Sequence, residues 1–258
     1  SANPGDFFTA SGQISAGQAG ISIAATYISA TLLLSTISKV YSTTWVLLPG
    51  ISSLFLTLWF VNRYYLPFFR RLEITSIYTY LEYRYNILMR LFADFSFIGF
   101  HFIQLSLMIY LPASALSFIG GWSLILCISG MGLIATAYIY IGGIRQIIRF
   151  DRGQVICLVG GLSVIIIWSI LDITSQDGGM AGVYRSGKMA LIQNSWLSKD
   201  LSLWVVLLGA MTIQLGLFTS DQSISQKFLV TADENTARKS IWVSGWLIIG
   251  ITLLFFIL

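Results

Sequence analysis

The sequence predicts an all-α membrane protein with about seven transmembrane helices. Of its 258 residues, 56% are hydrophobic and only 10% are charged, whereas an ordinary soluble domain carries about 25% charged residues. The apolar residues form seven long runs, and a helix needs about 20 such residues to cross a bilayer. Lysine and arginine gather in alternate connections between these runs. An alternating path through a lipid bilayer explains all three observations.

The seven runs define the expected helices. The first contains small and hydroxyl residues, the second is interrupted by Pro49-Gly50, and the third is long and contains Pro112. In chain order the runs are Gly20–Ile37, Thr44–Leu66, Leu91–Ile119, Trp122–Ile141, Gln154–Leu171, Leu201–Phe218 and Ile241–Leu258.

Four polar connections separate the later runs. Arg70–Asn86 is charged and aromatic, with the spacing of a short helix at the membrane interface. Gly142–Gly153 is expected to be a tight basic loop. Asp172–Asp200 is the longest loop, with a short helix near Val183–Gln193. Thr219–Ser240 is polar and expected to be helical.

The distribution of positive charge predicts an orientation. Eleven of the 15 lysine and arginine residues fall in the connections 63–90, 145–152 and 227–239, and four fall elsewhere. Since cytoplasmic loops carry the excess of positive charge, we expect the first group in the cytoplasm and the loop 173–200 outside.

The residues that carry enzyme chemistry are sparse. Cys127, Cys157 and His101 all lie in apolar runs, where packing cysteines and a buried, hydrogen-bonded histidine are expected. The sequence shows no Ser/His/Asp set, no Cys/His cluster and no phosphate-binding glycine loop. We therefore expect neither an enzyme nor a metal site beyond sodium, and no nucleic-acid partner.

Several polar positions allow two interpretations. The small residues of Ala24–Thr31 fit close helix packing, which composition favours, or a helix interrupted in mid-membrane. Asp151 could be a loop charge or an inward-facing carboxylate on a cation pathway. Gln104 and Gln214 could bond neighbouring helices or contact a solute.

Five stretches in order resemble the sodium/solute symporter family. Ile21–Thr31 is similar to its S-x-x-A-x-x-I-S-A core, and Asp6-Phe7-Phe8 to the D-Y-F stretch before it. Phe68–Glu82, FFRRLEITSIYTYLE, resembles the signature R-x-x-x-x-S-x-Y-E-Y-L-E. Tyr140–Gln154 and Asp221–Lys227, DQSISQK, resemble the family's GG…D-x-x-Q and D-Q-x-x-V-Q-R stretches.

The resemblance implies a five-plus-five inverted-repeat (LeuT-like) fold with an interrupted first helix. The chain would then be a single transmembrane domain, with the first repeat at about 18–172, an extracellular loop at 173–200 and the start of the second repeat at about 201–258. The resemblance also implies sodium as coupling ion, with no other cofactor. Its ligands would include the carbonyls of Ala25 and Ile28, and Asp151 would lie near the sodium route.

Within the family, the stretches TTWVLLPG, LPFFRRLEITSIYTYLE and LFADFSFIGFH resemble the sialic acid transporter branch. The solute positions differ. Gln104 stands where those transporters have an arginine, and Ile51 where they have a glutamine; Tyr27 and Leu32 replace smaller polar residues, and Ser29 is retained. Loss of the arginine removes a charge-assisted contact to a carboxylate and favours a neutral or differently placed polar solute. The substrate-binding candidates are Tyr27, Ser29, Gln104 and Gln214.

The resemblance thus implies sodium-coupled symport of a small polar organic solute, such as a sugar or sugar acid, across a bacterial cytoplasmic membrane. A transporter-like sensor module of a signalling protein is the alternative. The oligomeric state is not predicted. Since Ser1 is not a methionine and Trp246–Leu258 has no polar exit, we expect a fragment of a longer protein.

Overall fold

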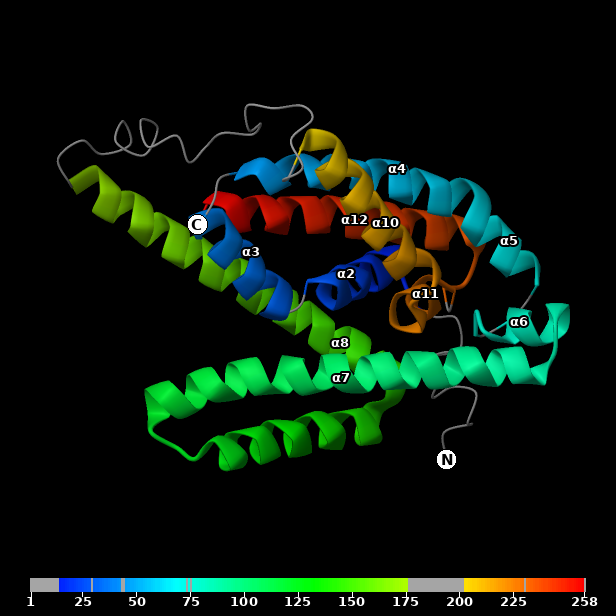
Figure 1. The fold of residues 1–258 in the computed structure, drawn as a ribbon, viewed down its shortest axis with the longest axis horizontal. Helices are drawn as coiled ribbons and strands as arrows, with labels where there is room; N and C mark the ends of the chain where they lie inside the picture. The colour runs from blue at the N-terminus through cyan, green and yellow to red at the C-terminus, as the bar shows by residue number, and fades with distance from the viewer. Residues whose placement is uncertain are drawn as a thin grey trace.

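The computed structural model describes residues 14–28, 30–42, 45–72, 74, 76–175, 202–229 and 231–257. Every regular element in these ranges is a helix, as predicted. Helices α2, α4, α10 and α12 pack into one group, against which α7 and α8 extend (Figure 1). The stretch around Asp6, Ser29 and the expected short helix at 183–193 lie outside the described residues.

Each of the seven predicted runs corresponds to helix. The first forms two short helices, α2 (Ala16–Tyr27) and α3 (Ala30–Ser42). The second spans Trp45–Arg71, the third is α7 (Ile87–Gly120), the sixth is α10 (Leu203–Thr219) and the seventh is α12 (Glu234–Ile257). Among the described residues, four helices are long and apolar enough to cross a membrane, and a fifth crossing results if the bent pair α10 and α11 (Gln222–Leu229) counts as one.

The loop predicted at Gly142–Gly153 is wrong. One helix, α8, has continuous helical backbone over Leu124–Ser175 and includes both the fourth and the fifth run. Its two arms, Leu124–Ala137 and Gln146–Thr174, point in different directions (Figure 1). The Gly142-Gly143 pair lies between them, and glycine pairs are where long helices change direction. A loop-like composition therefore marks a bend here.

The second span changes helical type along its length. It begins as the 3-10 helix η2 (Trp45–Ser52), which contains Pro49, and continues as α4 (Ser53–Phe60). A single π turn, η3 (Val61–Tyr65), joins α4 to α5 (Leu66–Arg71). The short helix α6 (Thr79–Arg84) follows within the connection where an interfacial helix was predicted.

The core lies where α2, α4, α10, α11 and α12 meet. Ile23, Leu58, Phe218, Phe228 and Phe255 are all fully buried there. By contrast, much of α7 and α8 carries exposed apolar side chains such as Phe92 and Ile134. Apolar side chains on a helix that crosses a bilayer can face lipid, so this exposure agrees with a membrane protein.

Close helix packing at glycines brings the core together. A Cβ added to Gly20 of α2 would lie 2.6 Å from Val243 Cγ1 and 2.8 Å from the Ser240 carbonyl oxygen of α12. Such contacts are the usual device of membrane helices. A small residue of the first run therefore serves packing, and the same run is also interrupted between α2 and α3.

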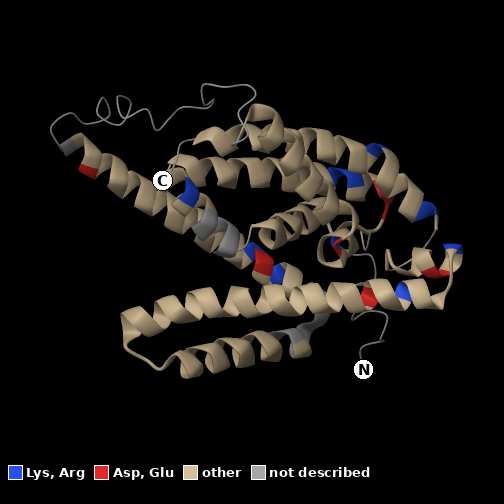
Figure 2. Ribbon diagram, viewed as in Figure 1, with Lys and Arg blue, Asp and Glu red and all other residues tan. Residues whose placement is uncertain are grey.

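Charged residues gather mainly toward one end of the helices (Figure 2). The α5–α6 connection, the start of α7, α11 and the start of α12 lie at this end. Most of the positive residues assigned to the cytoplasm belong to these segments, so their placement agrees with the predicted alternation of loops.

Candidate functional site

The first functional feature is the interruption between α2 and α3. Helix α2 begins at a capping box, in which Ser15 and Gln18 bond each other's backbone, and ends at Tyr27. Ile28 has extended backbone (φ −90°, ψ 90°), and α3 begins at Ala30. The last carbonyls of a helix have no intrahelical donor. Ala25 and Ile28, the predicted sodium ligands, are both buried and lie in this last turn and at its cap.

The second feature is a carboxylate turned toward α2. Asp151 of α8 accepts a short hydrogen bond from the Ser22 hydroxyl and forms an ion pair of 2.8 Å with Lys227 Nζ. The Asp151 side chain is only 14% exposed. The structure therefore places Asp151 inside the bundle, and the interpretation as an ordinary loop charge is wrong.

A cavity of about 420 Å³ borders Tyr27 at the end of α2 and is lined mainly by η2, α10 and α12. Tyr27 and Gln214, two predicted solute residues, both line it, together with Thr36 and Thr252. The other described lining residues are apolar, including Ile51, and none of the described lining residues is charged. A cavity of this composition suits an uncharged solute with an apolar face.

Gln214 also joins two helices. Its Oε1 accepts hydrogen bonds from Ser53 (2.9 Å) and Thr57 (3.4 Å), and its Nε2 donates to the Gly50 carbonyl (3.3 Å). This amide is 5% exposed. Gln214 therefore bonds η2 and α4, as one interpretation predicted, and it also borders the cavity; its contact with a solute stays a prediction.

Gln104 lies elsewhere in this structure. Its Oε1 is 3.0 Å from His101 Nδ1, and it is not among the residues that line the cavity of Tyr27 and Gln214. The other ring nitrogen of His101 lies 3.1 Å from Ser223 Oγ and 3.4 Å from Asp221 Oδ1. Thus His101 is hydrogen-bonded, as expected, but its side chain is 25% exposed and not buried. It connects α7 to the start of α11.

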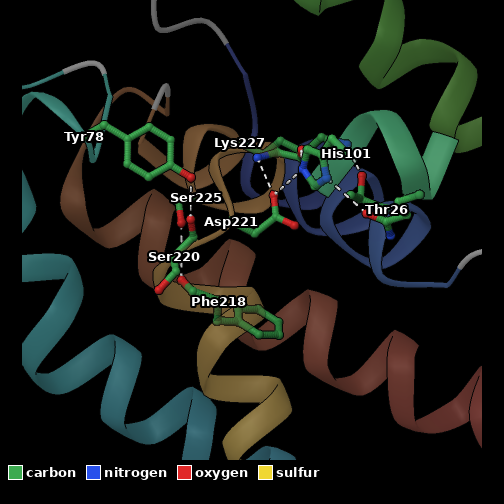
Figure 3. A network of polar contacts seen from close by, with 10 residues as sticks. Thr26, Tyr78, His101, Phe218, Ser220, Asp221, Ser225 and Lys227 are labelled. Atoms are coloured by element: carbon green, nitrogen blue, oxygen red, sulfur yellow. Dashed lines mark hydrogen bonds and ion pairs between the residues drawn. The ribbon is translucent and has the colours of Figure 1, made fainter. Parts of the chain in front are cut away.

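A second interruption occurs at Ser220-Asp221, where α10 and α11 meet at 57°. Tyr78, His101, Lys227 and Thr26 all lie around this bend (Figure 3). The Tyr78 hydroxyl donates to the Ser220 carbonyl at 2.8 Å, and Tyr65 donates to the Thr219 carbonyl. The two tyrosines therefore bond carbonyls at the end of α10.

Tyr78 lies outside the membrane-spanning segments. Burial raises its pKa to about 12, and the nearby carboxylates of Asp221 and Asp94 raise it as well. The hydroxyl is therefore protonated at neutral pH and available as a donor to Ser220.

Arg70 holds the far end of α11. Its guanidinium donates to the carbonyls of Phe228 (3.1 Å), Thr231 (2.8 Å) and Asp233 (3.3 Å). These carbonyls surround the turn between α11 and α12, where an α-helix leaves acceptors unpaired. The interfacial connection thus contacts both ends of α11.

Sequence reasoning did not find Lys227 and Ser22 as partners of Asp151, nor Thr26 as a partner of Lys227. Lys227 was counted among the cytoplasmic loop charges, but it is 7% exposed. Its position in the polar stretch DQSISQK gave no signal of burial. The available signal was the i, i+4 spacing of Ser22 and Thr26, which places both on one face of α2.

Two interrupted helices that line one cavity, with a largely buried carboxylate bonded to the helix before the first break, define a class: membrane transporters built from discontinuous helices. Comparison with known proteins gives the family. The family model described as "Sodium:solute symporter family" matches residues 7–258. The chain belongs to the sodium:solute symporter family, whose members are secondary transporters and not enzymes.

Individual relatives agree with this assignment. The chain is 31% identical to the sodium/sialic acid symporter NanT of Aliivibrio fischeri, covering 97% of this chain and 50% of that protein. It is 30% identical to the sodium/sialic acid symporter SiaT of Proteus mirabilis (97% and 51%) and 26% identical to human sodium-coupled monocarboxylate transporter 1 (93% and 39%). The chain spans about half the length of the two sialic acid symporters.

A solved structure shares the fold. The substrate-bound outward-open state of a Na+-coupled sialic acid symporter superimposes with a TM-score of 0.87 at 29% identity, covering 98% of this chain and 54% of that chain. The predicted LeuT-like transporter fold is thereby confirmed.

Proposed function

We propose that this chain forms part of a sodium-coupled symporter that carries a small polar organic solute. The observation that carries the proposal is the break at Ile28, beside the inward-facing Asp151. Interrupted helices in transporters expose carbonyl groups to coupling ions and helix ends to substrates. The relatives named above are described as sodium symporters or sodium-coupled transporters, which supports sodium as the coupling ion.

The oxygens beside the break fit a sodium ion. The carbonyls of Ala25 and Ile28 and the carboxylate of Asp151 would hold it or guide it, because hard cations prefer oxygen ligands. Ala25 and Ile28 are buried, so water would compete weakly for a bound ion. Neutralising Asp151 would then lower sodium affinity without altering the cavity.

The solute would bind in the cavity lined by Tyr27 and Gln214. Absence of a charged side chain among the described lining residues favours a neutral solute over a carboxylate. Ser29 and Gln104 stay in the proposal through the family resemblance alone. We therefore expect neutral sugars as substrates of this protein. Sialic acid, the substrate named for two relatives, serves as the solute for comparison.

A second interrupted helix later in the chain supports the proposed domain organisation of two repeats. Helix α10 bends into α11 as the first helix bends at Ile28, and interruptions at corresponding positions of two halves are typical of inverted repeats. The first repeat would occupy about 18–172 and the second would begin at about 201. The protein would lie in the lipid bilayer of a bacterial cytoplasmic membrane, with the basic connections inside.

Uptake into vesicles tests the proposal. The protein made from its complete gene would be reconstituted in liposomes, and entry of radiolabelled neutral monosaccharides and of sialic acid would be followed. An inward sodium gradient should drive accumulation of a neutral solute, whereas an equal choline gradient should not. Uptake that is indifferent to sodium would contradict the coupling.

A further inference from the structure

Lys227 is a buried ammonium group in the core of the bundle. It comes from α11, just beyond the second interruption, and its side chain is 8% exposed. A charge this well shielded from water is costly unless ionic and polar partners surround it. Buried charges inside membrane bundles are therefore candidates for a function in ion movement.

The partners of Lys227 are three oxygen groups on two other helices. Its Nζ donates to the Ser22 carbonyl (3.0 Å), to Asp151 Oδ2 (2.8 Å) and to the Thr26 hydroxyl. An ammonium group has three donors, so each donor has an acceptor. The set of a carbonyl, a hydroxyl and a carboxylate is also one that a sodium ion could use.

The ammonium lies beside the predicted sodium ligands. Thr26 follows Ala25 directly, and Ser22 is one turn before it on α2. Asp151 Oδ2 accepts both the Ser22 hydroxyl and Lys227 Nζ, so this one oxygen already serves two donors. A sodium ion that bound this oxygen would therefore compete with Lys227.

We propose that Lys227 is a tethered cation that occupies the sodium route beside Asp151 and that sodium displaces it. The proposal rests on the proposed sodium coupling. The ammonium holds α11 against α2 and α8. When sodium takes Asp151, Lys227 loses its carboxylate partner, and α11 is released from α8 near the second interruption. Arrival of the ion is thereby linked to movement at the bend.

The competing explanation is an ion pair that only stabilises the fold. Both explanations predict a loss of stability when Lys227 is replaced. Only displacement predicts a change in the sodium concentration that gives half-maximal thermal stabilisation. The readout is therefore sodium-dependent thermal stabilisation of the purified complete protein, titrated with sodium chloride against choline chloride at constant ionic strength.

Lys227→Gln removes the charge and keeps a hydrogen-bonding end. We expect the half-saturating sodium concentration to fall about tenfold, because a competing unit charge near the carboxylate is gone. Lys227→Arg keeps the charge and can bond the carboxylate with two donors, so the half-saturating concentration should rise; this variant decides the question if Lys227→Gln does not fold.

Arg238→Gln is the matched control. It also removes one positive charge and breaks an ion pair, that with Glu234 at 2.6 Å, but this pair is partly exposed at the start of α12. The half-saturating concentration should change by less than about twofold. A sodium response unchanged in both Lys227 variants would overturn the inference alone, whereas a wild-type protein that ignores sodium would overturn the coupling and the inference together.

Discussion

At the scale of single residues, the site consists of polar groups that each have two possible partners. Asp151 binds Lys227 and Gln214 bonds Ser53, and the proposed function gives them an ion and a solute as their second partners. An ion that takes Asp151 leaves Lys227 without its carboxylate, and a buried group that loses its partner costs free energy. Substitutions here should therefore alter affinity and stability together.

Asp151→Asn should weaken sodium dependence. The amide still accepts a hydrogen bond from Ser22, but it lacks the charge that attracts the ion, so the half-saturating sodium concentration for uptake should rise roughly tenfold. Lys227 would lose its ion-pair partner, at a cost of about 3 kcal/mol of stability.

The double variant Asp151→Asn/Lys227→Gln serves as the control for this loss. Because it contains no unpaired buried charge, it should recover most of the stability, while its sodium response stays weak. Unchanged sodium activation in Asp151→Asn would show that the carboxylate has no part in coupling.

Tyr78→Phe removes the hydrogen bond to the Ser220 carbonyl. At about pH 8 the variant should lose about 1 kcal/mol of stability. Since the pKa of Tyr78 is raised to about 12 in the folded protein, from 10.0 in a free tyrosine, the wild-type advantage is present below about pH 10 and declines as the pH rises toward 12. Denaturant unfolding followed by tryptophan fluorescence, at about pH 8 and about pH 12, measures the difference in stability between the wild type and the variant. A difference of constant size would contradict this assignment.

At the scale of helices, close contacts at glycine and bonds to helix ends position the site. Gly20 lets α2 approach α12, while Arg70 and Tyr78 bond carbonyls near the two ends of α11. The break at Ile28 was predictable because a recognisable motif contains it. The burial of Lys227 was not, since a polar stretch between two apolar runs has the composition of a cytoplasmic connection.

Gly20→Ala should destabilise the contact between α2 and α12. The added Cβ would lie 2.6 Å from a Val243 side-chain carbon and 2.8 Å from the Ser240 carbonyl oxygen, and the backbone oxygen cannot rotate away. Overpacking of this kind costs about 1–3 kcal/mol. Thermal unfolding of the detergent-solubilised protein would show the loss.

Gly17→Ala on the same helix is the comparison for this substitution. A Cβ at Gly17 meets nothing within 4 Å among the described atoms. Alanine is the better helix former, so this variant should be neutral or more stable by up to about 1 kcal/mol. Equal losses in the two variants would mean that the α2–α12 contact is not the cause.

At the scale of the whole molecule, composition and charge alternation predicted the class, and ordered motifs predicted the family. The bend within α8 escaped prediction because Gly142-Gly143 and its basic neighbours are typical of a loop. The separation of Gln104 from Tyr27 and Gln214 also escaped it, because sequence resemblance gives a position along a helix but not the partner of its side chain. Three-dimensional packing supplies that information.

The π turn Val61–Tyr65 affects the direction in which side chains after it point along the second span. A π turn contains one residue more than an α-helical turn, and each residue of an α-helix advances the direction of side chains by about 100°. Deleting one residue from α4, which has no extra residue, would rotate α5 by that amount, and Arg70 would point away from the Thr231 carbonyl. Deleting one residue from the π turn would instead restore an α-helical turn and largely keep the direction of α5. The hydrogen bonds from Arg70 to the end of α11 therefore depend on how many residues precede Arg70 as well as on its charge. A scan of single-residue deletions would reveal this dependence, whereas a scan of substitutions would not.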